Sequence, residues 1–193
     1  RDGVLLSDGQ LVVPANVSRT YNYIGKSNYS ADSLYQGYID EVRIYNIAKT
    51  KDEIQRMYNE GLEYRSNRVG STVNDGLISY WNMDEESGTS VNDSIGINNG
   101  TATGTTIVDG KVNKGRSFDG VDDYITFPSG FSDFTKGLTI SLWANPTSNG
   151  SYARFVDFGE PSGSAYTSIA LNRESTTNGL RFTVGNGSSP YPY

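Results

Sequence analysis

The sequence predicts an all-β protein in which two antiparallel sheets form a sandwich, with one short helix. The 193 residues include 22 glycines and 14 tyrosines, and 35% are apolar while 20% are charged. This balance is typical of short strands joined by tight turns. Apolar runs also recur at near-regular spacing between clusters of Gly, Asn, Asp and Ser, which is the pattern of a sandwich. A chain of this length is long enough to bury a full core.

The first part of the chain contains a hairpin followed by two strands. Two Asp-Gly turns beside apolar residues predict the hairpin over 1–13, and strands are expected at 21–25 and 37–45. If side chains alternated strictly along the second strand, Ile39 and Val42 could not face the same side. We therefore expect a β-bulge in this strand, or a strand that is covered on both sides.

A short helix is predicted over 50–59. Thr50 and Glu53 form a capping box, in which each side chain satisfies a free backbone donor of the first turn. Apolar residues then recur at three- and four-residue spacing, and Gly61 is placed to end the helix. The polar, aperiodic stretch 63–75 is the best candidate for a linker.

The remainder of the chain reads as a succession of strands. They are expected at 77–83, 101–108, 116–118, 123–127, 138–144, 153–158, 168–171 and 180–184. Four aromatic residues in these stretches are expected in the core: Trp81, Phe118, Trp143 and Phe182.

Composition excludes several functional classes. The net charge of −6 and a pI near 4.6 argue against a nucleic-acid partner, because phosphate binding needs a concentrated basic surface. The chain has no cysteine and no histidine, which excludes disulfides, thiol nucleophiles and the commonest zinc ligands. No stretch approaches the ~20 apolar residues that span a bilayer, so membrane insertion is not expected.

Three stretches of the second part resemble the N-terminal strands of a laminin G-like jelly roll of the concanavalin A-like lectin/glucanase superfamily. They are LISYWNMDEESGTSVNDSIGINNGTATG, GRSFDGVDDYITFP and FTKGLTISLWANP. In the first part, GYIDEVRIYNIAKTKDEIQRMYNEG resembles the closing strand and helix of the same family. The resemblance implies a two-sheet jelly-roll sandwich of the concanavalin A type.

The order of these motifs differs from that of a typical member, because the closing motif comes first. Residues 1–62 therefore read as a C-terminal half, 63–75 as a linker and 76–193 as an N-terminal half. Half a sandwich leaves strand edges unpaired and is unlikely to be stable alone. We expect the two halves to close one permuted sandwich within the chain; the alternatives are completion by other sequence or by a neighbouring copy through swapping.

Three aspartates are the candidate metal ligands. In relatives a structural calcium often bridges the first and last strands, and Asp40 lies in the matching last-strand motif. Asp84 ranks next, and Asp119 is the weakest candidate because FDG also makes a sound turn. Calcium, a hard cation with oxygen ligands, suits a chain without His or Cys. The alternative is that these carboxylates are solvated or cap turns.

Tyrosines within loops of Ser, Gly and Asn are the candidate ligand-binding residues, because an exposed ring beside amides can stack on a sugar or on a protein. Arg154 is a candidate polar partner, with a surface salt bridge as its alternative role. The candidate tyrosines of this kind are Tyr29, Tyr35, Tyr152 and Tyr166.

The E-x-D-x-x-E strand of the superfamily's glucanases does not occur in this chain, so we expect no enzyme. The expected function is an extracellular or cell-surface recognition or adhesion module that binds a glycan or a protein through loops at one rim. One alternative is a structural repeat of a surface polymer or fibre, in which copies associate by strand or domain swapping. The other, less favoured, is a glycoside hydrolase.

Overall fold

The computed structural model describes residues 2, 5–6, 12–59, 74–159 and 167–187, which form two antiparallel β-sheets packed face to face with one helix. The predicted all-β sandwich is confirmed. The larger sheet has seven strands, in the order β12 (Leu180–Val184), β11 (Ile169–Arg173), β10 (Arg154–Gly159), β1 (Tyr21–Ile24), β8 (Tyr124–Phe127), β5 (Gly100–Thr103) and β4 (Ser90–Val91).

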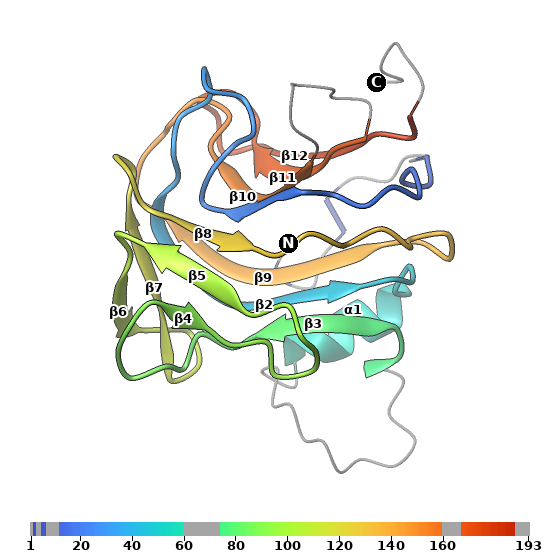
Figure 1. Ribbon diagram of the computed structural model, residues 1–193, viewed down its shortest axis with the longest axis horizontal. Coiled ribbons are helices and arrows are strands. Elements are labelled where there is room, and N and C mark those ends of the chain that lie inside the picture. Colours follow the sequence, from blue (N-terminus) through green and yellow to red (C-terminus); the bar gives the residue numbers. More distant parts are fainter. Residues whose placement is uncertain (1, 3–4, 7–11, 60–73, 160–166, 188–193) are drawn as a thin grey trace.

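The smaller sheet has five strands and is centred on β2 (Gln36–Tyr45). Along one edge of β2 lie β7 (Lys114–Asp119) and β3 (Leu77–Trp81), end to end, and β6 (Thr106–Asp109) pairs with β7. Along the other edge lies β9 (Thr139–Pro146). Figure 1 shows β10, β11 and β12 extending past β9, where the smaller sheet ends.

The two strands before the helix, β1 and β2, each pair with strands that follow residue 76. In the larger sheet β1 lies between β8 and β10, with Tyr23 opposite Thr126 on one side and Asp157 on the other. In the smaller sheet β2 pairs with β3, β7 and β9. The division into halves at 63–75 stays a prediction, and 63–73 lie outside the described residues.

The predicted bulge in β2 is present. Glu41 has a φ of +56°, and the register between β2 and β9 shifts between Asp40 and Arg43. The extra residue turns the strand so that Ile39 and Val42 both enter the core, with 1% and 0% of their surface exposed.

Helix α1 (Lys51–Asn59) begins at the predicted capping box. The Thr50 N–H donates to Glu53 Oε2 at 2.8 Å, and the Glu53 N–H donates to Thr50 Oγ1 at 3.3 Å. The helix lies against the smaller sheet (Figure 1). The ring centre of its Tyr58 is 5.6 Å from that of Trp143 on β9. No helix in the described part of the chain is long and apolar enough to cross a membrane.

One strand prediction was wrong. The run 101–108 forms β5 in one sheet and β6 in the other, because the chain turns at Gly104, whose φ is +73°. A side chain at Gly104 would collide with the Asp123 carboxylate, so only glycine fits this turn. The predicted hairpin over 1–13 falls largely outside the described residues, and Leu5, Leu6, Val12 and Val13 are not in strands.

The core lies between the sheets and combines aliphatic with aromatic side chains. Trp81 and Phe118 are buried in it as predicted, and Phe182 packs against it while partly exposed. Trp143 corrects the prediction, because its partly exposed ring lies beside α1 on the outer side of β9, whereas its neighbour Leu142 packs on the core. Strand alternation explains this, since adjacent side chains point to opposite faces.

Candidate functional site

Three tyrosines form a row on the outer face of the larger sheet. Side chains alternate along β1, so that Asn22 and Ile24 are buried while Tyr21 and Tyr23 face outward. The Tyr21 and Tyr23 ring centres are 6.4 Å apart, and the Tyr124 ring on β8 meets Tyr23 edge to face at 6.0 Å. Tyr21 exposes 41% of its surface. We call Tyr21, Tyr23 and Tyr124 the tyrosine row.

A lysine sits over this row. The Lys26 Nζ atom lies 4.1 Å from the ring centre of Tyr124 and 5.1 Å from that of Tyr23. A cation over a ring face is attracted by the negative charge of the π system. Lys26 therefore holds the two rings in place and adds a positive charge at one end of the row.

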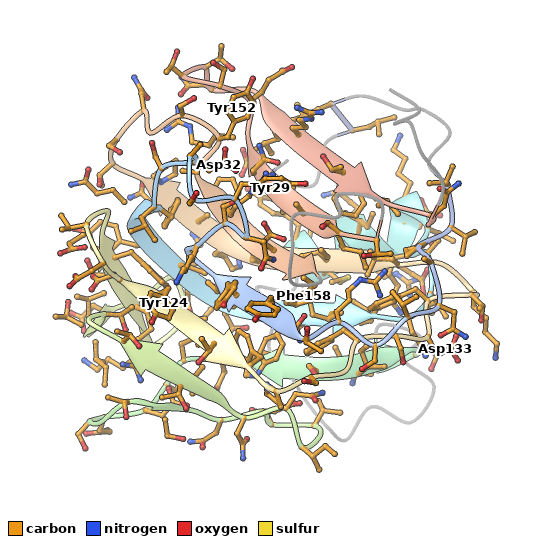
Figure 2. All side chains as sticks on the ribbon, turned by 45° about the horizontal axis from the view of Figure 1, so that its top comes forward. Tyr29, Asp32, Tyr124, Asp133, Tyr152 and Phe158 are labelled. Carbon is orange, nitrogen blue, oxygen red and sulfur yellow. The ribbon has the colours of Figure 1, made fainter. Side chains whose placement is uncertain are left out.

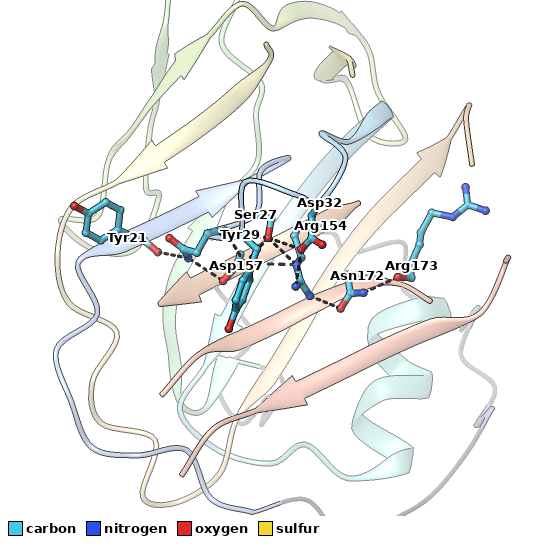
Figure 3. A network of polar contacts seen from close by, with 9 residues as sticks. Tyr21, Ser27, Tyr29, Asp32, Arg154, Asp157, Asn172 and Arg173 are labelled. Atoms are coloured by element: carbon cyan, nitrogen blue, oxygen red, sulfur yellow. Dashed lines mark hydrogen bonds and ion pairs between the residues drawn. The ribbon is translucent and has the colours of Figure 1, made fainter. Parts of the chain in front are cut away.

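A network of polar side chains borders the row and fastens the 25–35 loop to β10 (Figure 3). Asp157 accepts hydrogen bonds from the Asn28 N–H at 3.1 Å and from Asn28 Nδ2 at 2.9 Å. Arg154 pairs with Asp32 at 2.9 Å and donates to Asn172 Oδ1 at 2.7 Å. The loop that follows the row is therefore held by two charged side chains of β10, Arg154 and Asp157.

Burial shifts two pKa values in this region. It raises the pKa of Asp157, while hydrogen bonds from Asn28 and the charge of Arg154 act in the opposite direction. Burial is also the largest cause of the raised pKa of Tyr23, followed by the neighbouring Tyr21, Tyr124 and Asp157.

The predicted ligand-binding residues are dispersed. Tyr29 lies on the loop near Asp32, whereas Tyr152 lies apart from the row, toward the end of the molecule where β12 begins (Figure 2). Tyr35 corrects the prediction of an exposed ring, because it is fully buried and its hydroxyl donates to the Tyr38 carbonyl at 3.1 Å. Tyr166 lies outside the described residues.

Arg154 is mostly buried, and its guanidinium serves the network described above. The structure thus gives Arg154 partners within the protein, on the loop and on β11. Its predicted contact with a ligand stays a prediction.

Two of the predicted metal ligands hold the same turn. Asp40 Oδ2 accepts from the Val112 N–H at 2.9 Å, and Asp84 Oδ1 accepts from the Lys114 N–H at 3.0 Å. Both carboxylates therefore fix the turn between β6 and β7, which is the alternative role given to them above. Burial raises the pKa of Asp40 to about 7, and the neighbouring Glu41 adds to this effect.

Asp119 is the predicted ligand that lies in a cluster. The carboxylate oxygens of Asp119, Asp122 and Asp123 lie within 4.8 Å of one another, and this acidic triad could hold a metal ion. Asp123 is buried, and burial followed by its two acidic neighbours raises its pKa. Among the residues that the structure describes, Asp40 and Asp84 belong to no such group of three.

Sequence reasoning missed the tyrosine row. Its members lie in or beside predicted strands, whereas the tyrosines predicted to bind a ligand were those in loops. The Tyr-x-Tyr spacing of residues 21 and 23 does indicate two rings on one face. Their contact with Tyr124, about a hundred residues away, depends on the pairing of β1 with β8.

A family model described as the concanavalin A-like lectin/glucanases superfamily, of the laminin G type, matches residues 1–55 and 119–193. These stretches make up more than half of the chain and include strands of both sheets. Comparison with curated proteins and with solved structures finds no significant match. The chain therefore belongs to the concanavalin A-like lectin/glucanases superfamily.

Proposed function

We propose that this protein is a non-catalytic extracellular recognition module that binds carbohydrate on the outer face of its larger sheet. The observation that carries the proposal is the tyrosine row, in which three rings from two adjacent strands lie next to one another on one face. Rings of this kind offer flat apolar surface with a polar edge, which suits the apolar faces and hydroxyls of a sugar. The binding surface proposed is thus the sheet face rather than the rim loops.

The charges beside the row support binding rather than hydrolysis. A glycosidase needs two carboxylates, one of which acts as a general acid. Asp157 and Asp32 are the acids of the neighbouring network, and each is within 3.5 Å of Arg154. Carboxylates that hold a loop through one shared guanidinium are poorly placed to exchange protons with a substrate.

Replacing Tyr21 by alanine is expected to weaken glycan binding at least about 10-fold, because about 1.4 kcal/mol of stacking is lost. Tyr23→Ala should act in the same direction. Binding is measured by first screening a glycan array and then titrating the best glycan by calorimetry. Tyr152→Ala is the matched control, since this ring is similarly exposed and lies away from the row.

Equal affinities of the Tyr21 and Tyr152 variants would contradict the proposed surface. The wild-type chain could also bind no glycan on the array and instead capture a protein partner through the tyrosine row. In that case the ligand of the row is a protein and not a carbohydrate.

We further infer that the acidic triad binds calcium. Three carboxylates close together repel one another, and a divalent cation with oxygen ligands relieves this repulsion. Two hydrogen bonds within the turn hold these carboxylates in position. Asp119 Oδ1 accepts from the Val121 N–H at 2.8 Å, and Asp123 Oδ2 accepts from the Asp119 N–H at 2.8 Å.

Calcium is expected to stabilise the wild-type protein and not Asp122→Asn. A calcium concentration of 100 times Kd adds about 2.7 kcal/mol to the free energy of unfolding. The hydrogen bonds of the turn use the carboxylates of Asp119 and Asp123, so this variant keeps them. The measurement is urea unfolding with calcium or with EDTA, and Asp109→Asn, an exposed carboxylate outside the triad, is the control. The same stability of the wild type in both buffers would contradict the inference.

A further inference from the structure

The free edge of β9 is bordered by a groove. The groove has a volume of about 580 Å³, and every residue from Thr139 to Pro146 lines it. In the described part of the chain no strand pairs with this edge, because the partner of β9 is β2 on its other side. The backbone groups of β9 that point away from β2 therefore face the groove, along a strand of eight residues.

This edge lacks the features that normally prevent strand addition. Edge strands are commonly protected by charged side chains, bulges or prolines, or by being very short. β9 has eight residues, TISLWANP, which include no charge and place the proline at the end. Such an edge is a template for pairing with another strand.

Apolar side chains line part of the groove on both sides of the plane of β9. On the side of the core it is lined by Leu142 and by Leu171 and Leu180 of the larger sheet. On the side of the helix it is lined by Tyr58 and by Trp143, whose rings lie 5.6 Å apart. Adjacent residues of a strand point to opposite faces. A strand added to β9 would therefore direct one side chain toward the core side of the groove and the next toward the helix side. Apolar residues at two consecutive positions would suit both sides.

The guanidinium group in the groove already has hydrogen-bond partners within the protein. Asp2 and Arg173 are the charged residues of the lining. The Arg173 guanidinium donates to the Ser148 carbonyl, to the Thr177 carbonyl at 2.8 Å and to the side-chain oxygens of Asn149 and Asn178, each at 2.9 Å. An uncharged occupant therefore fits the groove better than an anionic one.

The chain itself carries a segment of the required chemistry. Leu5 and Leu6 expose 62% and 64% of their surface, and they are the one pair of adjacent residues among the exposed large apolar residues of the described chain. Asp2 lines the groove, and three residues of chain reach at most about 11 Å. Leu5 therefore lies near the groove of its own chain while remaining exposed.

We propose that two copies of this chain associate by placing Leu5 and Leu6 of each copy in the β9 groove of the other. Paired as a strand with β9, one leucine packs on the Leu142 side and the other on the Trp143 side. Since donor and groove lie close together in each copy, two copies can make both contacts about one two-fold axis. The inference is independent of the proposed glycan surface, which lies on the outer face of the larger sheet.

The test is the mass of the protein in solution at increasing concentration, measured by sedimentation velocity. We expect a concentration-dependent dimer for the wild type and a monomer for the double variant Leu5→Asp, Leu6→Asp. Leu180→Asp, which alters the groove at a residue 45% exposed, should also be monomeric. The control is Ile97→Asp, a highly exposed apolar residue that is outside the groove lining, and it should dimerise like the wild type.

Mixing the two monomeric variants provides a second measurement. The double variant keeps an intact groove and Leu180→Asp keeps intact leucines, so the mixture should regain one of the two contacts and form a weaker heterodimer. A synthetic peptide of residues 1–13 should bind the double variant, and the same peptide with aspartate at positions 5 and 6 should not.

A wild-type chain that stays monomeric at all concentrations would overturn the proposal, whatever the peptide does. Dimers that persist in both the leucine and the groove variants would overturn it as well. A monomeric chain whose groove binds a glycan or another protein would assign the groove to that ligand instead.

Discussion

Replacing Trp81 by alanine is expected to lower the free energy of unfolding by about 3–5 kcal/mol, a large share of the roughly 5–15 kcal/mol typical of a domain. Trp81 ends β3 in the smaller sheet and is fully buried. Its ring centre lies 4.2 Å from that of Phe127 in the larger sheet, and its Nε1 donates to the Asn98 carbonyl at 2.8 Å. The variant therefore loses packing between the sheets and leaves a carbonyl without its donor.

Urea unfolding measures this effect, and Trp143→Ala is its control. Trp143 has the same side chain but lies partly exposed beside α1, so its loss should cost roughly 1 kcal/mol. Similar costs for the two variants would show that the core does not lie where we place it.

Asp40→Asn is expected to stabilise the protein at pH 8, with little effect at pH 4. The folded pKa of Asp40 is raised to about 7 from an ordinary value of 3.8. Between these two values the folded protein holds the proton more tightly than the unfolded chain, so this group lowers stability as the pH rises. Above pH 7 the cost of the buried charge is roughly 2–4 kcal/mol, and an asparagine does not carry it.

The asparagine side chain of this variant keeps an amide oxygen for the Val112 N–H, so the turn between β6 and β7 is preserved. The measurement is the difference in unfolding free energy between variant and wild type at the two pH values. Asp109→Asn serves as the control, because this carboxylate at the end of β6 is exposed and is paired with Lys114. An Asp40→Asn effect that is the same at pH 4 and pH 8 would contradict the raised pKa.

Local features of the fold could be predicted from the sequence because their causes are local. The mismatch between Ile39 and Val42 predicts a bulge or a strand covered on both sides, and the structure has the bulge at Glu41. The spacing of Thr50 and Glu53 predicts the start of α1. The division of the run 101–108 into β5 and β6 could not be predicted in the same way. At Gly104, where the run divides, the Asp123 carboxylate leaves no room for a side chain, and Asp123 is distant in sequence.

The candidate site was less predictable because it depends on contacts across strands. Tyr35 stands among polar residues in the sequence, yet at the end of the 25–35 loop its side chain points into the core. The ring centre of Tyr35 lies 5.7 Å from that of Phe118. Asp40 and Asp84 were predicted as metal ligands, and the turn that both of them hold becomes visible only when β6 and β7 are placed.

Hydrogen exchange of the backbone amides in the intact chain tests the central claim most directly. The claim is that strands from both sides of residues 60–73 form one sandwich, which brings Tyr21 and Tyr23 next to Tyr124. Since β1 is paired on both edges, its amides should exchange as slowly as those of β10, its neighbour in the sheet. Amides of β1 that exchange at unprotected rates while β10 and β11 stay protected would contradict the account.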